Sequence, residues 1–500
     1  MNAASDVDIE VDVLIVGAGI SGLGAAYYLQ RDLPKKSYAI VESRGAIGGT
    51  WDLHRYPGIR SDSDLFTFGY EFKPWKGDSI ASAESIRAYL GDVADQYGMH
   101  DKISFHTKVV GASWNTDESR WTVEIENTET GQRSRARCSW LFAATGYYRY
   151  DQGFTPEFAG RAEFERTGRQ VIHPQLWPEN LDYTGKKIVV IGSGATAVTL
   201  VPAMAADAEH VTMLQRSPSY IVALPTRDRI ADTLRALLPE QRAHAIIRGK
   251  NVLTQRAIWR LCQRFPVAAR RLIRNNNAKQ LPPGYPVDVH FNPRYNPWDQ
   301  RLCMVPDGDL FAAISRGSAS VVTDTIETFT PTGILLTSGK HLRADLVVTA
   351  TGLNLQAFGG IDLTIDGERF SPADAVSFKG MMLTGVPNFA YSIGYTNSSW
   401  TLKVGLLCEH FVRLLDHMNS HGYSTCSPVL PDNLETRPLL DFDAGYVLRS
   451  LDQLPKQGPG FPWLTSRDYL NDVKLLRHGP VADPNLHFGT RRAQPTAASA

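Results

Sequence analysis

Two glycine-rich loops are the residues whose types and spacing point most directly to chemistry. The first runs Gly17-Ala18-Gly19-Ile20-Ser21-Gly22 and has the spacing GxGxxG. In this pattern Gly17 permits a tight turn, Gly19 lets a pyrophosphate approach the backbone, and Gly22 lets a helix pack on a strand. Glu42 follows 20 residues after Gly22, where its carboxylate can accept hydrogen bonds from ribose hydroxyls. The spacing predicts a dinucleotide site that suits a free ribose, as in FAD or NAD.

The second loop, Gly192-Ser193-Gly194-Ala195-Thr196-Ala197, has alanine at the third position, which the packing role tolerates. No acid follows it. Instead Arg216, with Ser217 beside it, comes 19 residues after Ala197. A guanidinium binds a phosphate bidentately, whereas a carboxylate would repel it. The second loop therefore predicts an NADPH site, whose contacts would be Gly192, Gly194, Thr196, Arg216 and Ser217. The alternative for Arg216 is a solvated surface position.

A third segment, Gly48 to Asp62 (GGTWDLHRYPGIRSD), combines a Gly-Gly turn, aromatic residues and acids. Paired glycines let the backbone approach a flat ligand closely. The candidate ligand contacts are Gly49, Thr50, Trp51 and Asp62.

The sequence around both loops predicts βαβ units. Apolar, β-branched runs suit parallel strands that are buried on both faces. The expected elements are a strand at 11–16, a helix at 23–30 and a strand at 38–41, then a strand at 187–191, a helix to about 206 and a strand at 210–214. Two further apolar strands, 139–143 and 345–349, each end in an Ala-Thr-Gly turn, at 144–146 and 350–352.

The repeated turns bracket the second unit, which favours one discontinuous domain interrupted by another. We therefore predict an α/β fold with two Rossmann-like dinucleotide-binding domains, the second inserted into the first. The FAD-binding domain would comprise 1–150 and 340–490. The NADPH-binding domain would comprise 151–339 with a helical insertion at about 225–300, and 491–500 would be a disordered tail.

The predicted insertion has an unusual charge pattern. Glu240 to Gln280 holds ten Lys or Arg residues and a single acid, Glu240, with apolar residues interleaved. Two interpretations stay open: a basic amphipathic surface for peripheral contact with a membrane or anionic ligands, and a helical subdomain with a solvated basic face.

The composition excludes several classes of protein. The chain has 500 residues, 52 Lys and Arg against 52 Asp and Glu, 43% hydrophobic and 21% charged residues. These values are typical of globular proteins and argue against disorder, collagen or coiled coil. Balanced charge gives no basic footprint for nucleic acid.

Cysteine, histidine and hydropathy patterns bear on disulfides, metal sites and the cellular location. The five cysteines form no CxxC pair and the 13 histidines no HxH or HExxH pair, so we expect no disulfide scaffold and no metal site. The first eight residues lack a signal-peptide pattern, and no stretch approaches the ~18 apolar residues that span a bilayer. We expect a soluble, cytoplasmic protein with no transmembrane segment.

Residues 48–62 carry the resemblance to a known family. They resemble the second fingerprint of class B flavin monooxygenases, [A/G]GxWxxxx[F/Y]P[G/M]xxxD, and meet every fixed position; type I Baeyer–Villiger monooxygenases are a branch of this family. Asp345–Gly352 resembles a later family motif. The segments 181–203, 213–222, 296–303 and 394–403 resemble the mycobacterial, ethionamide-activating subgroup.

The resemblance implies an enzyme that uses FAD, NADPH and O2. A C4a-peroxyflavin would insert one oxygen atom into a ketone and give an ester or lactone, with sulfoxidation as a second activity. The partners would be a small ketone or sulfide and O2. The alternative is a flavin monooxygenase that oxidises sulfur or nitrogen, and sequence motifs do not separate the two, because both use the same intermediate.

The resemblance also assigns Arg301 as the catalytic arginine, with Asp62 holding its guanidinium and both contacting cofactor. A permanently charged guanidinium suits stabilisation of anionic oxygen species. Many family members have lysine before this arginine, whereas this chain has Gln300. A domain-interface salt bridge is the alternative for Arg301, and Arg60 is either a secondary site residue or a surface charge.

One family motif, FxGxxxHxxxW[P/D], departs from its pattern. His173 and Trp177 are in place, but Phe164 and Gly168 lie farther apart than usual, and four residues separate Gly168 from His173 instead of three. We assign His173 and Trp177 to positioning in the interdomain linker. The insertion would affect rate and coupling more than reaction type.

Two other classes share parts of this layout. NAD(P)H-dependent disulfide reductases have two nucleotide sites but need a dithiol near the flavin, and this chain has no close cysteine pair. A non-catalytic flavoprotein would keep Glu42 and Arg216 but have no use for Arg301 beside Asp62.

Overall fold

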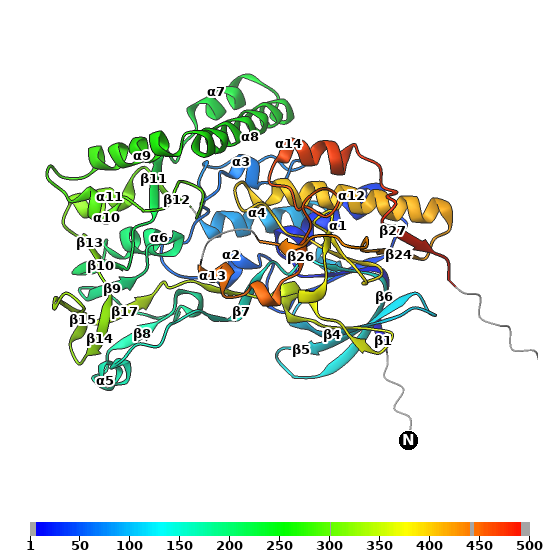
Figure 1. Ribbon diagram of the computed structural model, residues 1–500, viewed down its shortest axis with the longest axis horizontal. Coiled ribbons are helices and arrows are strands. Elements are labelled where there is room, and N and C mark those ends of the chain that lie inside the picture. The colour runs from blue at the N-terminus through cyan, green and yellow to red at the C-terminus, as the bar shows by residue number, and fades with distance from the viewer. Residues whose placement is uncertain (1–6, 301, 441–444, 492–500) are drawn as a thin grey trace, which may run out of the picture.

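The computed structural model describes residues 7–300, 302–440 and 445–491, and within them two sheets organise the chain (Figure 1). The larger sheet has the order β20-β19-β4-β5-β6-β1-β2-β3, with β23 also paired to β6. Its strands are β1 (Val7–Val16), β2 (Tyr38–Val41), β3 (Ile103–Ser104), β4 (Thr107–Asn115), β5 (Arg120–Asn127), β6 (Arg133–Ala143), β19 (Asp362–Ile365), β20 (Glu368–Arg369) and β23 (Phe389–Tyr391). Strands β6, β1, β2 and β3 run parallel, which is the Rossmann-like part.

The second sheet is parallel throughout and has the order β13-β10-β9-β17-β8. Its strands are β8 (Gln170–Ile172), β9 (Lys187–Ile191), β10 (His210–Gln215), β13 (Ala319–Thr323) and β17 (Leu346–Thr349). Because the chain enters this sheet after β6 and returns to the first sheet at β19, the second unit is inserted into the first. The predicted fold class is confirmed.

Local patterns placed the C-terminal ends of the strands closely and their beginnings less closely. Strands β2 and β9 have the predicted bounds, and the predicted strand at 11–16 begins earlier, at Val7. Helix α1 (Ile20–Asp32) begins within the glycine loop rather than after it, and α6 (Ala195–Met204) ends two residues early. The loop amides therefore already belong to the first helical turn.

Strand β17 corrects the domain boundary drawn at 339/340. It pairs with β9 and β8, so residues 346–349 belong to the second sheet and not to the returning part of the first. Just outside the sheets, β7 (Tyr148–Gly153) pairs with β18 (Leu353–Leu355). We propose that both crossings between the domains lie on this pair, near residues 150 and 353.

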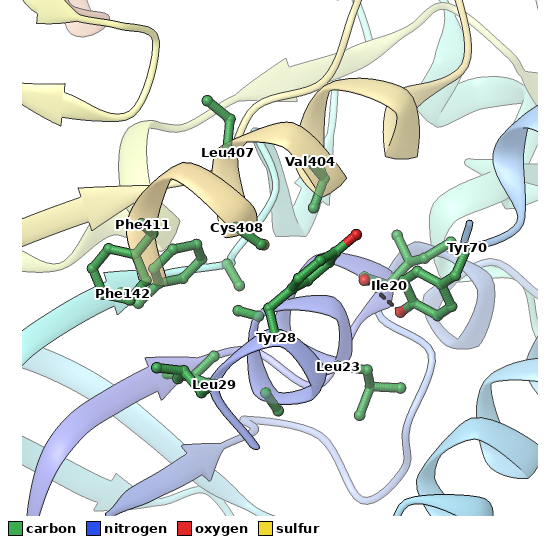
Figure 2. Close-up of a cluster of buried hydrophobic side chains, with 14 of the residues drawn as sticks. Ile20, Leu23, Tyr28, Leu29, Tyr70, Phe142, Val404, Leu407, Cys408 and Phe411 are labelled. Atoms are coloured by element: carbon green, nitrogen blue, oxygen red, sulfur yellow. Dashed lines mark hydrogen bonds between the residues drawn. The ribbon is translucent and has the colours of Figure 1, made fainter. Parts of the chain in front are cut away.

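Helices cover the first sheet in a continuous apolar core. Helix α12 (Trp400–His421) packs on α1, and Figure 2 shows Tyr28 of α1 against Val404 and Cys408 of α12. The Tyr70 hydroxyl closes this core by donating to the carbonyl of Ile20 at 2.5 Å. The core thus fixes α1, and with it the first glycine loop.

The predicted insertion is helical and forms an outer edge of the molecule, drawn in green at the top of Figure 1. It consists of α7 (Arg229–Leu237), α8 (Glu240–Arg264), α9 (Pro266–Gln280) and α10 (Val287–His290), between β11 (Tyr220–Leu224) and β12 (Leu302–Pro306). Strands β11 and β12 pair in parallel at its base.

The remaining elements are short or connect these units. They are α2 (Thr50–Leu53), α3 (Leu65–Phe68), α4 (Ala83–Gln96), α5 (Arg161–Arg166), α11 (Asp309–Ser315), α13 (Gly445–Leu448), α14 (Tyr469–Asp472), β14 (Ile326–Thr330), β15 (Gly333–Leu336), β16 (His341–Arg343), β21 (Ser377–Phe378), β22 (Met382–Leu383), β24 (Thr425–Pro428), β25 (Arg437–Pro438), β26 (Lys456–Gln457) and β27 (Leu486–Gly489). Across the described ranges, none of the helices is long and apolar enough to cross a bilayer.

Candidate active site

A single cavity of about 1870 Å³ runs from the first glycine loop to the helical insertion. Its wall takes residues from the first sheet, from the paired strands β11 and β12, and from α8, α9 and α12. Of the predicted site residues, it is lined by Gly17, Gly19, Glu42, Gly49, Thr50, Trp51 and Asp62. Segments far apart in the sequence therefore meet in one space large enough for several ligands.

Two glycines of the first loop have no room for a side chain. Gly17 has a φ of +107°, and a Cβ there would lie 2.8 Å from the carbonyl oxygen of Ala144. A Cβ on Gly22 would lie 1.9 Å from the carbonyl oxygen of Gly17, which is the close helix–strand packing predicted for this position. Gly19 instead approaches Gly49, whose Cα would be 3.6 Å from an added Cβ. The two glycine turns thus lie in close contact, and both line the cavity.

Glu42 is buried at the end of β2 and braces this loop. Its carboxylate accepts from the backbone N–H of Ala18 at 2.8 Å and of Arg44 at 2.9 Å. Burial raises the pKa of Glu42, and these two N–H donors oppose the rise. One carboxylate therefore orients the glycine loop and also faces the cavity.

The 48–62 segment connects the two sheets. Asp52, which is buried, is bridged by Arg44 at 2.8 Å and by Arg55. Farther along, Tyr56 is buried in the core of the second unit, and its hydroxyl hydrogen-bonds the side chain of Thr196. A Cβ on Gly58, whose φ is +74°, would lie 2.7 Å from Cβ of Ala203 on α6. The segment therefore begins at the first loop and ends against α6.

An ion pair joins the end of the 48–62 segment to α11. Arg60 donates to Asp309 on α11 at 2.6 Å, and its side chain is only 15% exposed. The alternative of a plain surface charge for Arg60 is thus replaced by a link between the two nucleotide units.

The second loop repeats the geometry of the first but lies nearer the surface. Gly192 has a φ of +136°, and a Cβ there would lie 2.3 Å from the carbonyl oxygen of Ala350. Each loop therefore rests on one of the two Ala-Thr-Gly turns. Ser193 donates to the carbonyl of Ser217 at 3.2 Å, which joins the loop to the residue after Arg216.

Arg216 and Ser217 are exposed at the end of β10. As far as the described residues define the cavity, its wall does not include Gly22, Gly192, Gly194, Thr196, Arg216 or Ser217. The predicted NADPH contacts therefore lie outside the cavity, directly after the C-terminal ends of β9 and β10.

The linker residues His173 and Trp177 also lie outside the cavity wall. The His173 ring contacts the carbonyl of Gly352 at 3.0 Å through Nε2, and its Nδ1 accepts from the N–H of Gln175 at 3.1 Å. Burial lowers the pKa of His173, which favours the neutral ring that this acceptor role requires. Trp177 packs against the core of the second unit. Both contacts hold the linker to the inserted unit.

Arg301 lies outside the described residues. Trp298 and Leu302, which flank it in the sequence, both line the cavity, as does Asp62. Ser63 donates to Asp62 at 3.5 Å. The assignment of Arg301 and Asp62 as a catalytic pair stays a prediction.

Sequence patterns missed a polar wall opposite the glycine turns. Asp64 accepts from Asn251 at 2.8 Å and from Gln255 at 2.9 Å, both on α8, and Ser398 donates to Gln255 at 3.1 Å. All four residues line the cavity, and burial raises the pKa of Asp64. Asp64 lies two residues beyond the family motif; only tertiary contact joins it to α8.

The five cysteines are buried and free, so the described residues contain no disulfide. Within the same residues no group of three or more His, Cys, Asp or Glu side chains is placed to hold a metal ion.

The chain is similar to known proteins of one kind. Residues 11–246 match the family described as pyridine nucleotide-disulphide oxidoreductase. The FAD-containing monooxygenase EthA of Mycobacterium tuberculosis is 54% identical over 97% of this chain and 98% of its own length. The probable FAD-binding monooxygenase AlmA of Acinetobacter baylyi is 48% identical over 96% of each chain.

Among solved structures, an oxidised steroid monooxygenase bound to NADP superposes with a TM-score of 0.73 at 21% identity, over 96% of this chain and 100% of that one. This likeness supports the two-domain fold, and the sequence relatives confirm the resemblance seen in the motifs. The chain belongs to the family of FAD-containing monooxygenases.

Proposed function

We propose that this protein is an FAD- and NADPH-dependent Baeyer–Villiger monooxygenase that inserts one oxygen atom of O2 into ketones and gives esters or lactones. The observation that carries the proposal is the cavity that joins the first glycine loop and the 48–62 segment to a chamber under α8 and α9 with both apolar and polar walls. A flat redox cofactor and a small organic substrate fit side by side in such a space.

The residues present fit FAD. Gly19 and Gly49 line the cavity with backbone alone, so a ligand can approach the chain closely there. The N-terminus of α1 presents backbone N–H groups to a pyrophosphate beside them, and buried Glu42 lies at the end of β2 to accept from ribose hydroxyls. Gly17, Thr50 and Trp51 complete the wall.

When bound, FAD accepts a hydride from NADPH and activates O2, and this chemistry belongs to the cofactor. The chain's own residues bind and orient the cofactor and the substrate. Apolar side chains on β11, β12, α8 and α9, among them Val222, Met304, Ile258 and Leu272, favour a hydrophobic ketone in this part of the cavity. Arg301 would supply a fixed positive charge for oxygen anions, with Asp62 orienting it.

NADPH would bind at the C-terminal ends of β9 and β10 in the second sheet. Gly192, Gly194 and the first turn of α6, with Thr196, suit a pyrophosphate, and exposed Arg216 with Ser217 suits a 2′-phosphate. The nicotinamide would then reach the cavity across the 48–62 segment, which touches both units. His173 and Trp177 would set the angle of the linker. A cytoplasmic location stays a prediction.

The test is product analysis with holoprotein, NADPH, O2 and a matched methyl ketone and thioether of equal chain length. We expect ester from the ketone, in proportion to NADPH oxidised, at a rate that rises with pH, because attack on a carbonyl needs a deprotonated oxidant. Sulfoxidation needs a protonated oxidant and should show the opposite trend.

Sulfoxide without ester would assign the chain to the heteroatom-oxidising branch. Hydrogen peroxide without either product would mark an oxidase. Arg301→Ala should retain flavin and its reduction by NADPH but lose the ester. Arg294→Ala, at an exposed position in the same segment, is the matched control and should keep the ester.

A further inference from the structure

The helical insertion carries a concentration of exposed apolar side chains. Six of them point away from the core at 48–74% exposure: Leu237, Ile246, Leu253, Leu261, Phe265 and Val267. We call these six residues and the basic residues between them the α7–α9 surface. Helix α7 packs on α8, and α8 packs on α9, so the surface forms one outer edge of the molecule (Figure 1).

The helices beneath this surface are firmly anchored, so its apolar residues do not reflect a loosely folded segment. Buried Arg248 donates to the carbonyls of Phe66, Thr67 and Gly69 at 2.8–3.2 Å. Arg256 pairs with Asp468 at 2.7 Å. The insertion therefore presents its outward side chains from a fixed platform.

The charge on this edge is predominantly positive. Residues 241–287 contain ten Lys or Arg residues and no Asp or Glu. Some are neutralised from elsewhere, for example Lys250 by Asp228. Within the described ranges Arg242, Arg264, Arg271 and Lys279 make no ion pair, and Arg264 instead lies over the Phe265 ring at 5.6 Å. The chain as a whole is neutral, so this excess is local.

The same helices form the mouth of the cavity. Leu224, Ile230, Ile258 and Leu272 line the cavity and are also exposed, by 39%, 57%, 50% and 62%. They come from β11, α7, α8 and α9 in turn. The apolar cavity thus opens between apolar side chains that continue into the α7–α9 surface.

We propose that the α7–α9 surface docks on an anionic lipid bilayer and that the cavity receives a lipid-soluble substrate directly from it. Apolar side chains insert at the boundary of headgroups and acyl chains, while the basic residues between them pair with anionic headgroups. A second copy of this chain is a poorer partner, because two surfaces with a net positive charge repel one another. Substrate loading rests on the proposed function, whereas docking does not.

The docking test uses full-length holoprotein sedimented with vesicles of phosphatidylcholine alone or phosphatidylcholine with phosphatidylglycerol. We expect binding to the anionic vesicles and release at high salt. Arg242→Gln with Arg264→Gln and Arg271→Gln should lower the partition coefficient on the order of 100-fold, since each basic residue near an anionic surface contributes roughly fivefold. Ile246→Ser with Leu253→Ser and Leu261→Ser should lower it more than about tenfold.

The matched control is Val429→Ser with Leu430→Ser, two exposed apolar residues at 55% and 41% exposure outside the insertion; it should bind as the wild type does. Wild-type protein that stays in the supernatant with anionic vesicles at low salt would overturn the proposal. So would a stable oligomer that the Ile246, Leu253 and Leu261 variant dissociates, because a second copy would then occupy the surface.

The loading test compares a long-chain methyl ketone held in anionic vesicles with a short water-soluble ketone. For the Ile246, Leu253 and Leu261 variant we expect kcat/KM to fall at least tenfold for the long ketone and to stay unchanged for the short one. Equal values for both would overturn loading from the bilayer. Absence of turnover with either ketone in the wild type would overturn the proposed function, and vesicle binding would still decide docking.

Discussion

Arg216 is the residue on which the choice of nicotinamide cofactor depends. It is exposed beside the second glycine loop, where a 2′-phosphate would form a charge-assisted, bidentate contact. We expect Arg216→Ala to raise the KM for NADPH about 10–100-fold and to leave that for NADH nearly unchanged, because such contacts contribute about 1.5–3 kcal/mol.

Steady-state kinetics with both nucleotides measure this prediction. Arg316→Ala, at another exposed arginine of the same unit, is the control and should change neither KM. Equal weakening of NADH and NADPH by Arg216→Ala would show that the guanidinium does not read the 2′-phosphate.

A second residue-scale feature is the buried ion pair of Lys403 on α12 with Asp472, at 2.5 Å. The Tyr395 hydroxyl, on the cavity wall, also donates to Asp472 at 2.6 Å. Removing one charge leaves the other buried and unpaired, so Lys403→Met should lower the free energy of unfolding by about 3–5 kcal/mol. Urea denaturation followed by tryptophan fluorescence measures the change.

The double variant Lys403→Met with Asp472→Asn should recover most of that loss, because the asparagine oxygen still accepts from Tyr395. Lys474→Met, at an exposed lysine two residues after Asp472, should change the free energy of unfolding little. If the double variant is no more stable than the single one, the charge of Lys403 is not what stabilises this contact.

At the scale of elements, the two glycine loops are built alike, each resting on an Ala-Thr-Gly turn. The turns follow β6 and β17, which pair with β1 and β9 in parallel. Strand pairing therefore brings residues more than 100 positions apart into contact at each loop. In the second loop, alanine substitutions of its two glycines should therefore have different effects.

Gly192→Ala should damage the fold of the second unit, because its Cβ would meet the carbonyl of Ala350 at a φ that disfavours alanine. Gly194 has an ordinary φ of −81° and no atom within 4 Å of an added Cβ. We expect Gly194→Ala to keep the melting temperature and raise the KM for NADPH at least tenfold, because the methyl group would meet the pyrophosphate.

Thermal unfolding and NADPH titration of the two variants separate these effects. An unchanged KM in Gly194→Ala would mean that no phosphate approaches this turn. Retention of wild-type melting by Gly192→Ala would contradict the close contact with Ala350.

For the whole molecule, buried histidines predict the pH dependence of stability. Burial lowers the pKa of His54 and His244 to about 4 and that of His410 to about 3. The unfolded chain then binds more protons than the folded one between pH 6.5 and about 4, so stability is full above pH 6.5 and falls as the pH drops through this window. His54 and His244 each account for about 3 kcal/mol over it.

We therefore expect the melting temperature to fall steadily from pH 7 to pH 5 in scanning calorimetry, and less steeply in His244→Gln. Burial raises the pKa of Glu42 and Asp64, which opposes the histidines as the pH falls. A melting temperature that is constant or rises toward pH 5 would contradict the lowered pKa values.

The sequence by itself determined the two βαβ units, the order in which one interrupts the other, and the family. Those features depend on local signals: β-branched runs buried on both faces, glycines required by turns, and an acid or arginine at a fixed distance. Strands β2 and β9 therefore have the bounds that the pattern predicted. The roles assigned to individual residues, above all to Arg301, stay predictions.

Only the tertiary structure decided which segments meet. Strand β17 belongs to the second sheet, Arg60 pairs with Asp309, and Asp64 meets α8, because pairing and burial act between residues far apart in the sequence. The basic insertion was ambiguous from its composition, since a charge run looks the same on a solvated face and on a docking face. Its fixed orientation around the mouth of the cavity depends on packing, which no local pattern records.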